Sequence, residues 1–142
     1  MGLSPVEITM KLVDDKVKLK GISKTSPDTP IIFDYLPPLG TGDGFVGIEM
    51  IVMSFAGCVS TAIIGLLKRR GKVLHSYEMK IIGSKHEDPL FLEAIEFTTL
   101  VGADDVTEEE LAEVLMFAEK ISPAWIAIQG NVKVTGKIRL VI

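Results

Sequence analysis

Apolar and polar residues alternate along the first part of the chain, which is the pattern of strands with one buried face. The alternation runs over residues 6–12, and it resumes over residues 17–21 after an acidic pair, Asp14-Asp15, that is typical of a turn. A short third strand is predicted at residues 30–35. The stretch that follows, residues 36–47, is rich in proline and glycine and predicts a loop.

A helix is predicted from about residue 48 to residue 70, ending near Gly71 with a cationic last turn that suits the helix dipole. Apolar residues occur on all sides of this helix, so it must be covered on every side. Two interpretations remain open. The helix packs in the core against its own sheet, or a partner subunit covers it, with the small residues Gly57, Thr61 and Gly65 forming a groove for a second helix.

Residues 50–67 carry no charge and are long enough to span a bilayer. The stretch contains several small and polar residues, with Glu49 at its start, and it lies between segments that read as strands of a soluble sheet. The sequence therefore favours a buried helix of a soluble protein over a membrane span.

The second half of the chain alternates strands with helices. Strands are predicted at about residues 77–81 and 94–101. Thr107 and Glu110 form a capping box at the start of the next helix, which Pro123 ends. Ser122 is then predicted to be the N-cap of a short helix over residues 123–129. With a closing strand over residues 132–140, the plan is α+β, and we expect a single domain over residues 1–142.

Composition narrows the class of protein. The chain has 142 residues, 47% of them hydrophobic, and a net charge of −4, which fits a globular domain and argues against nucleic-acid binding. A single cysteine, Cys58, excludes an intrachain disulfide and indicates a reducing compartment, the cytoplasm. Neither His75 nor His86 has partners at metal-ligand spacing, so no metal is expected.

Two local patterns have weak functional signals. Residues 42–47 match G-x-G-x-x-G, but no buried strand precedes them and no acidic strand end follows about twenty residues later, so we expect a loop and no cofactor. Cys58 lies about ten residues into an apolar helix, where the local sequence offers neither a cation nor a helix N-terminus to activate a thiol. The local sequence alone predicts a structural cysteine.

Two motifs at a fixed separation carry a family resemblance. Residues 47–58 read GIEMIVMSFAGC and residues 118–124 read AEKISPA. Together they resemble the two cysteine motifs of the OsmC/Ohr family (osmotically inducible protein C and organic hydroperoxide resistance). The resemblance implies an OsmC-like α+β fold in which antiparallel sheets wrap two central helices of an intertwined homodimer, with active sites at the subunit interface.

The resemblance also implies thiol chemistry. In typical members a peroxidatic cysteine is oxidised by a hydroperoxide to a sulfenic acid, and a second cysteine resolves it as a disulfide. Here the first position is Cys58 and the resolving position carries Ser122, so the two-cysteine cycle is excluded. The family glutamate corresponds to the neighbourhood of Glu49, which lies nine residues before Cys58 and hence on the opposite face of a straight helix.

The arginine that poises the thiolate in typical members is also missing, because the first arginine of this chain is Arg69. The cations available in the early strands are Lys18, Lys20 and Lys24. We expect Ser122 to be structural, capping the short helix. Its replacement by alanine should cost about 0.5–2 kcal/mol and leave peroxide chemistry unchanged.

Two functions follow as hypotheses. The first is a peroxiredoxin-like, one-cysteine reduction of organic hydroperoxides in oxidative stress defence, with Cys58 as nucleophile and an external thiol as reductant. The second is a catalytically degenerate dimer that binds a small apolar molecule without turnover. A membrane-anchored protein is a third and less favoured class. The expected partners are a second copy of the chain, a small apolar molecule or hydroperoxide, and a thiol, with no nucleic acid and no membrane.

Overall fold

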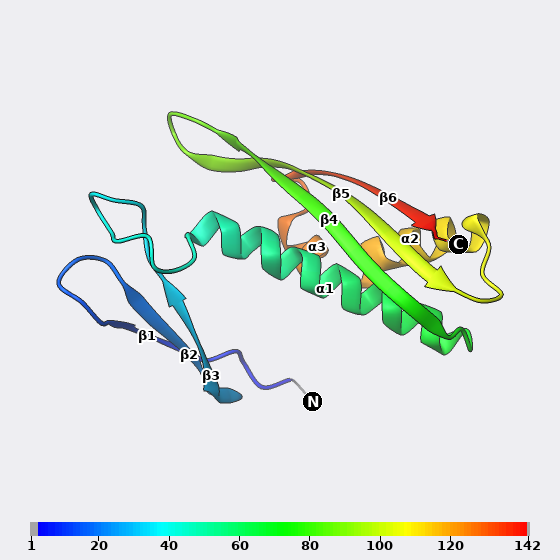
Figure 1. Cartoon of the computed structure of the whole chain (residues 1–142), viewed down its shortest axis with the longest axis horizontal. Coiled ribbons are helices and arrows are strands. Elements are labelled where there is room, and N and C mark those ends of the chain that lie inside the picture. Colours follow the sequence, from blue (N-terminus) through cyan, green and yellow to red (C-terminus); the bar gives the residue numbers. More distant parts are fainter. Residues whose placement is uncertain (1–2, 142) are drawn as a thin grey trace. The chain divides into compact units, whose positions relative to one another are not determined.

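A computed structural model describes residues 3–141 of the chain (Figure 1). The chain divides into two compact units, and the boundary between Met50 and Ile51 falls inside the long helix α1. The first unit holds three strands, namely β1 (Ile8–Leu12), β2 (Leu19–Ser23) and β3 (Ser26–Phe33). The second holds most of α1 (Gly47–Arg69) and then β4 (Leu74–His86), β5 (Phe91–Ala103), α2 (Glu108–Ile121), α3 (Pro123–Ile128) and β6 (Lys133–Leu140).

The first unit is an antiparallel sheet in the order β1-β2-β3. Leu19 pairs with Leu12 on one side and with Phe33 on the other. Asp14 forms the predicted turn between β1 and β2, since its carboxylate accepts the backbone N–H groups of Lys16 and Lys18. The third strand begins four residues earlier than the predicted residue 30 and ends at Phe33.

The loop after β3 is organised around a buried carboxylate. Asp34 is 5% exposed, and it accepts hydrogen bonds from the Thr41 hydroxyl and from the backbone N–H groups of Tyr35, Thr41 and Asp43. The Thr41 hydroxyl, followed by the backbone donors, holds the pKa of Asp34 well below its ordinary value. The glycine-rich segment is therefore a loop over residues 42–46, as the sequence predicted, tied to Asp34 through the Asp43 N–H, and Gly47 begins α1.

The second unit contains a three-stranded sheet in the order β4-β5-β6 (Figure 1). Strands β4 and β5 are antiparallel, whereas β6 runs parallel to β5, with Ala94 paired to Lys133 and Val101 to Leu140. The expectation of wholly antiparallel sheets is wrong at this strand. The chain returns through α2 and α3 to the end of the sheet where β5 began, and such a helical crossover produces a parallel neighbour.

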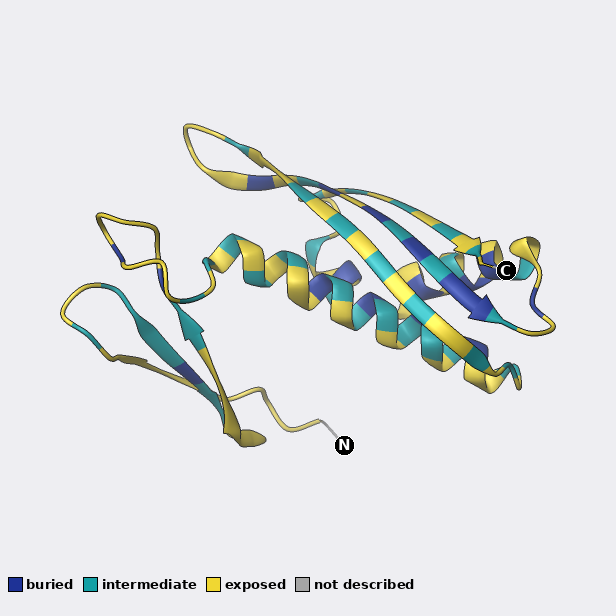
Figure 2. Ribbon diagram, in the orientation of Figure 1, coloured by how far each residue is buried: buried dark blue, intermediate teal, exposed yellow. Residues whose placement is uncertain are grey.

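One stripe of α1 supplies much of the core. Phe55, Val59, Ile63 and Leu67 are at most 1% exposed, and Figure 2 shows the buried positions recurring along one side of the helix. This stripe follows the spacing of a helix face packed on a sheet. A Cβ at Gly83 of β4 would lie 2.7 Å from Val52, so the glycine permits close approach of helix and strand.

The opposite side of α1 is open. Gly57, Thr61 and Gly65 are exposed, and a Cβ at either glycine would meet nothing within 4 Å. The protein's own sheet thus covers one side of the helix, which is one of the two interpretations that the sequence left open. The helix is long and apolar enough to cross a membrane by length and composition, but its buried stripe is typical of a soluble core helix, and a membrane span is not indicated.

The predicted helix caps are present in the second unit. The Thr107 hydroxyl accepts the N–H of Glu110 at 3.1 Å and begins α2. The Ser122 hydroxyl accepts the N–H of Trp125 and begins α3, while Pro123 occupies its first turn. The N-cap roles of Thr107 and Ser122 are confirmed, and the ends of α2 and α3 lie within one residue of those predicted. In place of the return bond of the predicted capping box, the Glu110 carboxylate pairs with Arg70 and Lys72.

Candidate functional site: a thiol and a hydroxyl joined across the second unit

Two residues 64 positions apart come into contact in the second unit. The Ser122 hydroxyl lies 3.3 Å from Cys58 Sγ, within hydrogen-bond distance for a sulfur acceptor. Cys58 projects from the middle of α1, whereas Ser122 stands at the junction of α2 and α3. The thiol is half-buried, so its sulfur is not sealed inside the core.

The hydrogen bonds around Ser122 fix the direction of its hydroxyl proton. The side chain is fully buried, and its oxygen accepts the Trp125 backbone N–H at 3.4 Å. The Ser122 backbone N–H donates to Ala118 O at 2.9 Å and closes the C-terminus of α2. Because the oxygen already accepts from the backbone, its own proton is directed at the sulfur, where it would stabilise negative charge.

Ser122 is thus both a helix cap and a neighbour of the thiol. The residues themselves predicted only the first role, while the family resemblance placed Ser122 at the position that resolves Cys58. The second role arises from the end-to-end arrangement of α2 and α3, which places their shared cap residue against α1. No local signal in the sequence gives that contact.

Three aromatic side chains pack on one another in the core of the second unit. Phe55, one turn before Cys58, lies 6.0 Å from Phe97 and 5.5 Å from Trp125 between ring centroids. Phe97 and Trp125 meet edge to face at 5.7 Å. All three rings are less than 10% exposed, and Phe55 and Trp125 each lie three residues from Cys58 or Ser122, so a packed apolar group joins the elements that carry the pair.

A polar contact on another side of α1 was not foreseen. The Tyr77 hydroxyl of β4 donates to Ser60 Oγ at 2.8 Å. Burial raises the pKa of Tyr77 above its ordinary value, although the hydrogen bond with Ser60 opposes the shift. This contact joins the helix to the sheet and involves neither Cys58 nor Ser122.

The other predicted site residues are engaged locally in the first unit and at its boundary. Glu49 is exposed in the first turn of α1, and its carboxylate accepts the backbone N–H of Val46 at 3.3 Å. Lys18 pairs with Asp43 at 3.0 Å, a contact that raises the pKa of the lysine, and Lys24 pairs with Glu7 at 2.8 Å.

The histidines and the arginine nearest the end of α1 also have local partners. His75 Nε2 lies 2.9 Å from Asp104, and the His86 ring stacks on Phe91. Arg70 forms ion pairs with Glu110 and Glu113 of α2. Over residues 3–141, no group of three or more histidine, cysteine or acidic side chains is arranged to hold a metal ion.

Taken together, the fold and site define an α+β protein in which a single thiol of a long apolar helix contacts a buried hydroxyl. The family model described as OsmC-like protein matches residues 40–137. The chain belongs to the OsmC-like protein family. No curated protein sequence matches the chain significantly.

Solved structures share the fold over nearly the whole chain. An OsmC-like protein from Mycoplasma pneumoniae superimposes with a TM-score of 0.83 at 22% identity, covering 98% of this chain and 99% of that one. An organic hydroperoxide resistance protein from Elizabethkingia anophelis gives 0.77 at 16% identity, with 99% of each chain covered. A protein from Legionella pneumophila described as an organic hydroperoxide resistance protein OsmC gives 0.72 at 15% identity, covering 97% and 98%.

Proposed function

We propose that this protein is a one-cysteine, thiol-dependent reductase of organic hydroperoxides. Cys58 is the nucleophile, and Ser122 is a hydrogen-bond donor to its sulfur. The observation that carries the proposal is the 3.3 Å contact between the Ser122 hydroxyl and Cys58 Sγ on a half-buried thiol. Membership of the OsmC-like family and the names of the structural neighbours support the substrate class.

The proposed reaction requires two external thiols for each hydroperoxide. The Cys58 thiolate attacks the terminal oxygen of R–O–OH, the O–O bond breaks, and the alkoxide leaves and takes up a proton as the alcohol. Cys58 is now a sulfenic acid. A first external thiol attacks its sulfur and releases water, leaving a mixed disulfide on Cys58, and a second thiol releases the external disulfide and restores the thiol.

The Ser122 hydroxyl has a defined part in this scheme. It cannot form a disulfide, so resolution passes to a thiol from solution. Since its proton is directed at Cys58 Sγ, it would favour the charged form of the nucleophile through a charge-assisted hydrogen bond. The buried aromatic group of Phe55, Phe97 and Trp125 anchors the elements that carry the two groups.

We propose further that the working form is a homodimer. On the open side of α1, Met53 is 48% exposed, and it lies on the same row of the helix as the small residues Gly57, Thr61 and Gly65. In the first unit, β1 exposes Ile8, Met10 and Leu12, which share one face of the strand. Exposed apolar side chains together with small residues that allow close approach are typical of subunit interfaces. A reducing cytoplasm would supply the external thiol.

The test is the trapping of the proposed sulfenic acid. Reduced protein is treated with cumene hydroperoxide near neutral pH in the presence of dimedone, which labels sulfenic acids. Intact mass and peptide mapping should locate one adduct on Cys58, and Cys58→Ser should give none. A dimedone adduct is required because the chain also has six methionines, whose sulfoxides add oxygen to the mass.

Turnover is measured separately. With a small thiol present, wild-type protein should consume hydroperoxide beyond one equivalent and release the alcohol, and Cys58→Ser should not. If Cys58 stays unlabelled under excess hydroperoxide, the reductase proposal fails, and binding without turnover is the function that remains.

A further inference from the structure

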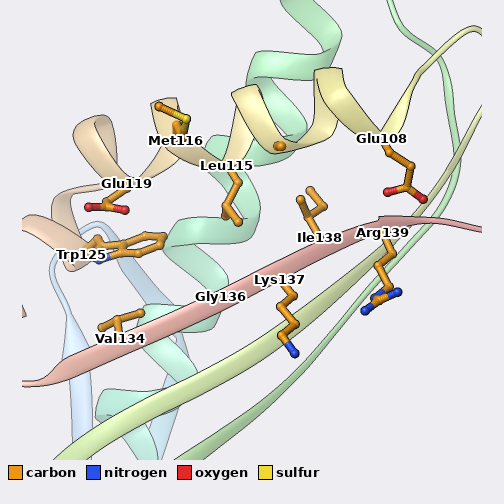
Figure 3. Close-up of a pocket in the computed structure, with 11 residues that line it drawn as sticks. Glu108, Leu115, Met116, Glu119, Trp125, Val134, Gly136, Lys137, Ile138 and Arg139 are labelled. Atoms are coloured by element: carbon orange, nitrogen blue, oxygen red, sulfur yellow. The ribbon is translucent and has the colours of Figure 1, made fainter.

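Another feature of the second unit lies outside the Cys58–Ser122 contact. An open cleft of about 440 Å³ runs between α2, α3 and β6 (Figure 3). Its apolar wall consists of Leu115 and Met116 of α2, Trp125 of α3, and Val134 and Ile138 of β6. The volume is within the range of small-molecule sites.

The Trp125 ring that lines the cleft is packed against Phe97 behind it. Gly136 of β6 lies opposite Phe97 of β5, and a Cβ at this position would overlap the Phe97 ring. Without a side chain at Gly136, the Phe97 ring reaches β6 and packs edge to face on Trp125 at 5.7 Å. The indole ring that lines the cleft is thereby fixed in place, and it is only 6% exposed.

Acidic side chains stand at both ends of this apolar wall. Glu119 lies beside the Trp125 ring, and Glu108 lies at the opposite end (Figure 3). Glu108 accepts the backbone N–H of Leu140 at 3.1 Å, whereas Glu119 forms no ion pair with any side chain in residues 3–141. An aromatic ring next to a carboxylate is the combination that binds organic ammonium groups.

Two basic residues border the cleft without neutralising Glu119. Lys137 and Arg139 alternate along β6 with the inward-facing Val134, Gly136 and Ile138. Their side chains extend from the side of β6 that is turned away from α2 (Figure 3). The end of the cleft at Trp125 is therefore apolar with one acidic group.

We propose that this cleft binds a small apolar molecule that carries a positively charged ammonium group. The alkyl part lies along Leu115, Val134 and Ile138, and the ammonium lies between the Trp125 ring and the Glu119 carboxylate. The inference does not rest on peroxide chemistry, because neither Cys58 nor Ser122 lines the cleft.

The experiment uses three probes with the same alkyl chain and different head groups: octyltrimethylammonium, octan-1-ol and octanoate, each below its micellar concentration. Trp125 is the single tryptophan of the chain, so its fluorescence reports directly on the cleft. We expect saturable changes, with octyltrimethylammonium binding at least tenfold more tightly than octanoate. Equal affinity for the cation and the anion, or no saturable change, would overturn the proposal.

Matched variants assign the selectivity and the place of binding. Glu119→Gln should reduce the preference for the cation several-fold, and Glu109→Gln, a carboxylate of α2 that does not line the cleft, should leave it unchanged. Ala112→Leu, at an exposed helical position that lines the cleft, should weaken binding of the alcohol and the cation alike. An unchanged preference in Glu119→Gln would refute the assignment.

A second copy of the chain is the competing occupant of the cleft. If it filled the cleft, the fluorescence response to the cation would diminish as protein concentration rises through the range of self-association. A response independent of protein concentration is expected. Cys58→Ser should bind the cation as the wild type does, so a failure of the reductase proposal is distinguishable from a failure of this one.

Discussion

Replacing Ser122 with alanine removes one hydroxyl that makes two contacts. The hydroxyl accepts the Trp125 N–H at 3.4 Å and donates to Cys58 Sγ at 3.3 Å. The backbone bond from Ser122 N–H to Ala118 O at 2.9 Å does not depend on the side chain and should persist. Since alanine keeps the Cβ, the change creates almost no cavity, and it tests the hydroxyl alone.

The expected loss of stability follows from burial. An N-cap hydroxyl contributes about 0.5–2 kcal/mol, and a buried N–H left without a partner costs about 1–3 kcal/mol. Ser122 is fully buried, so water cannot replace the hydroxyl at the Trp125 N–H, and we expect a loss of about 2 kcal/mol. Thr107→Ala is the matched control: its hydroxyl caps α2 in the same way but is exposed, so we expect a loss of about 1 kcal/mol or less.

Both variants are measured by urea unfolding at one fixed protein concentration, with Trp125 fluorescence as the signal. At an m-value of about 2 kcal/mol per molar urea, Ser122→Ala should lower the midpoint by about 1 M and Thr107→Ala by about half of that. A midpoint for Ser122→Ala equal to that of the wild type would refute the cap argument.

The same variants separate the cap from the contact with sulfur. Because the hydroxyl proton is directed at Cys58, Ser122→Ala should slow the labelling of Cys58 by hydroperoxide and dimedone several-fold under native conditions. From the sequence alone we expected this substitution to leave peroxide chemistry unchanged. Thr107→Ala should not slow it. Equal labelling rates in both variants and the wild type would show that the contact has no chemical consequence.

Two further predictions concern the acid response and the assembly of the protein. Hydrogen bonds from Thr41 and neighbouring backbone groups lower the pKa of Asp34 below its ordinary value of 3.8. The stability that these bonds contribute is therefore complete at a pH well above 3.8, and it is lost as the pH falls through the lower pKa of the folded state. Asp34→Asn should therefore melt at a lower temperature at pH 7 and lose less stability than the wild type on acidification, and parallel melting curves would contradict this. Light scattering should give about twice the monomer mass of 15.4 kDa, and a stable monomer at micromolar concentration would exclude the shared interface.

The sequence by itself determined the order of the elements and where the capped helices α2 and α3 begin, whereas β3, β4 and β5 each begin at least three residues before the predicted position. The sequence was enough to identify Thr107 and Ser122 as N-caps, because the side-chain oxygen at an N-cap accepts a backbone N–H only two or three residues later. The strands were recognisable from the alternation of apolar and polar residues, which is also local, since strand geometry places successive residues on opposite faces. The pair of motifs at residues 47–58 and 118–124 was enough to indicate the family.

Only the tertiary structure decided the arrangements that join distant parts of the chain. The parallel pairing of β6 with β5 depends on the path taken through α2 and α3, which no local pattern records. The contact between Cys58 and Ser122, and the cleft on the far side of Trp125, depend on how α1, α3 and β6 pack around one aromatic group. Such contacts are set by the packing of side chains far apart in sequence, whereas caps and alternation are set by neighbours a few residues away.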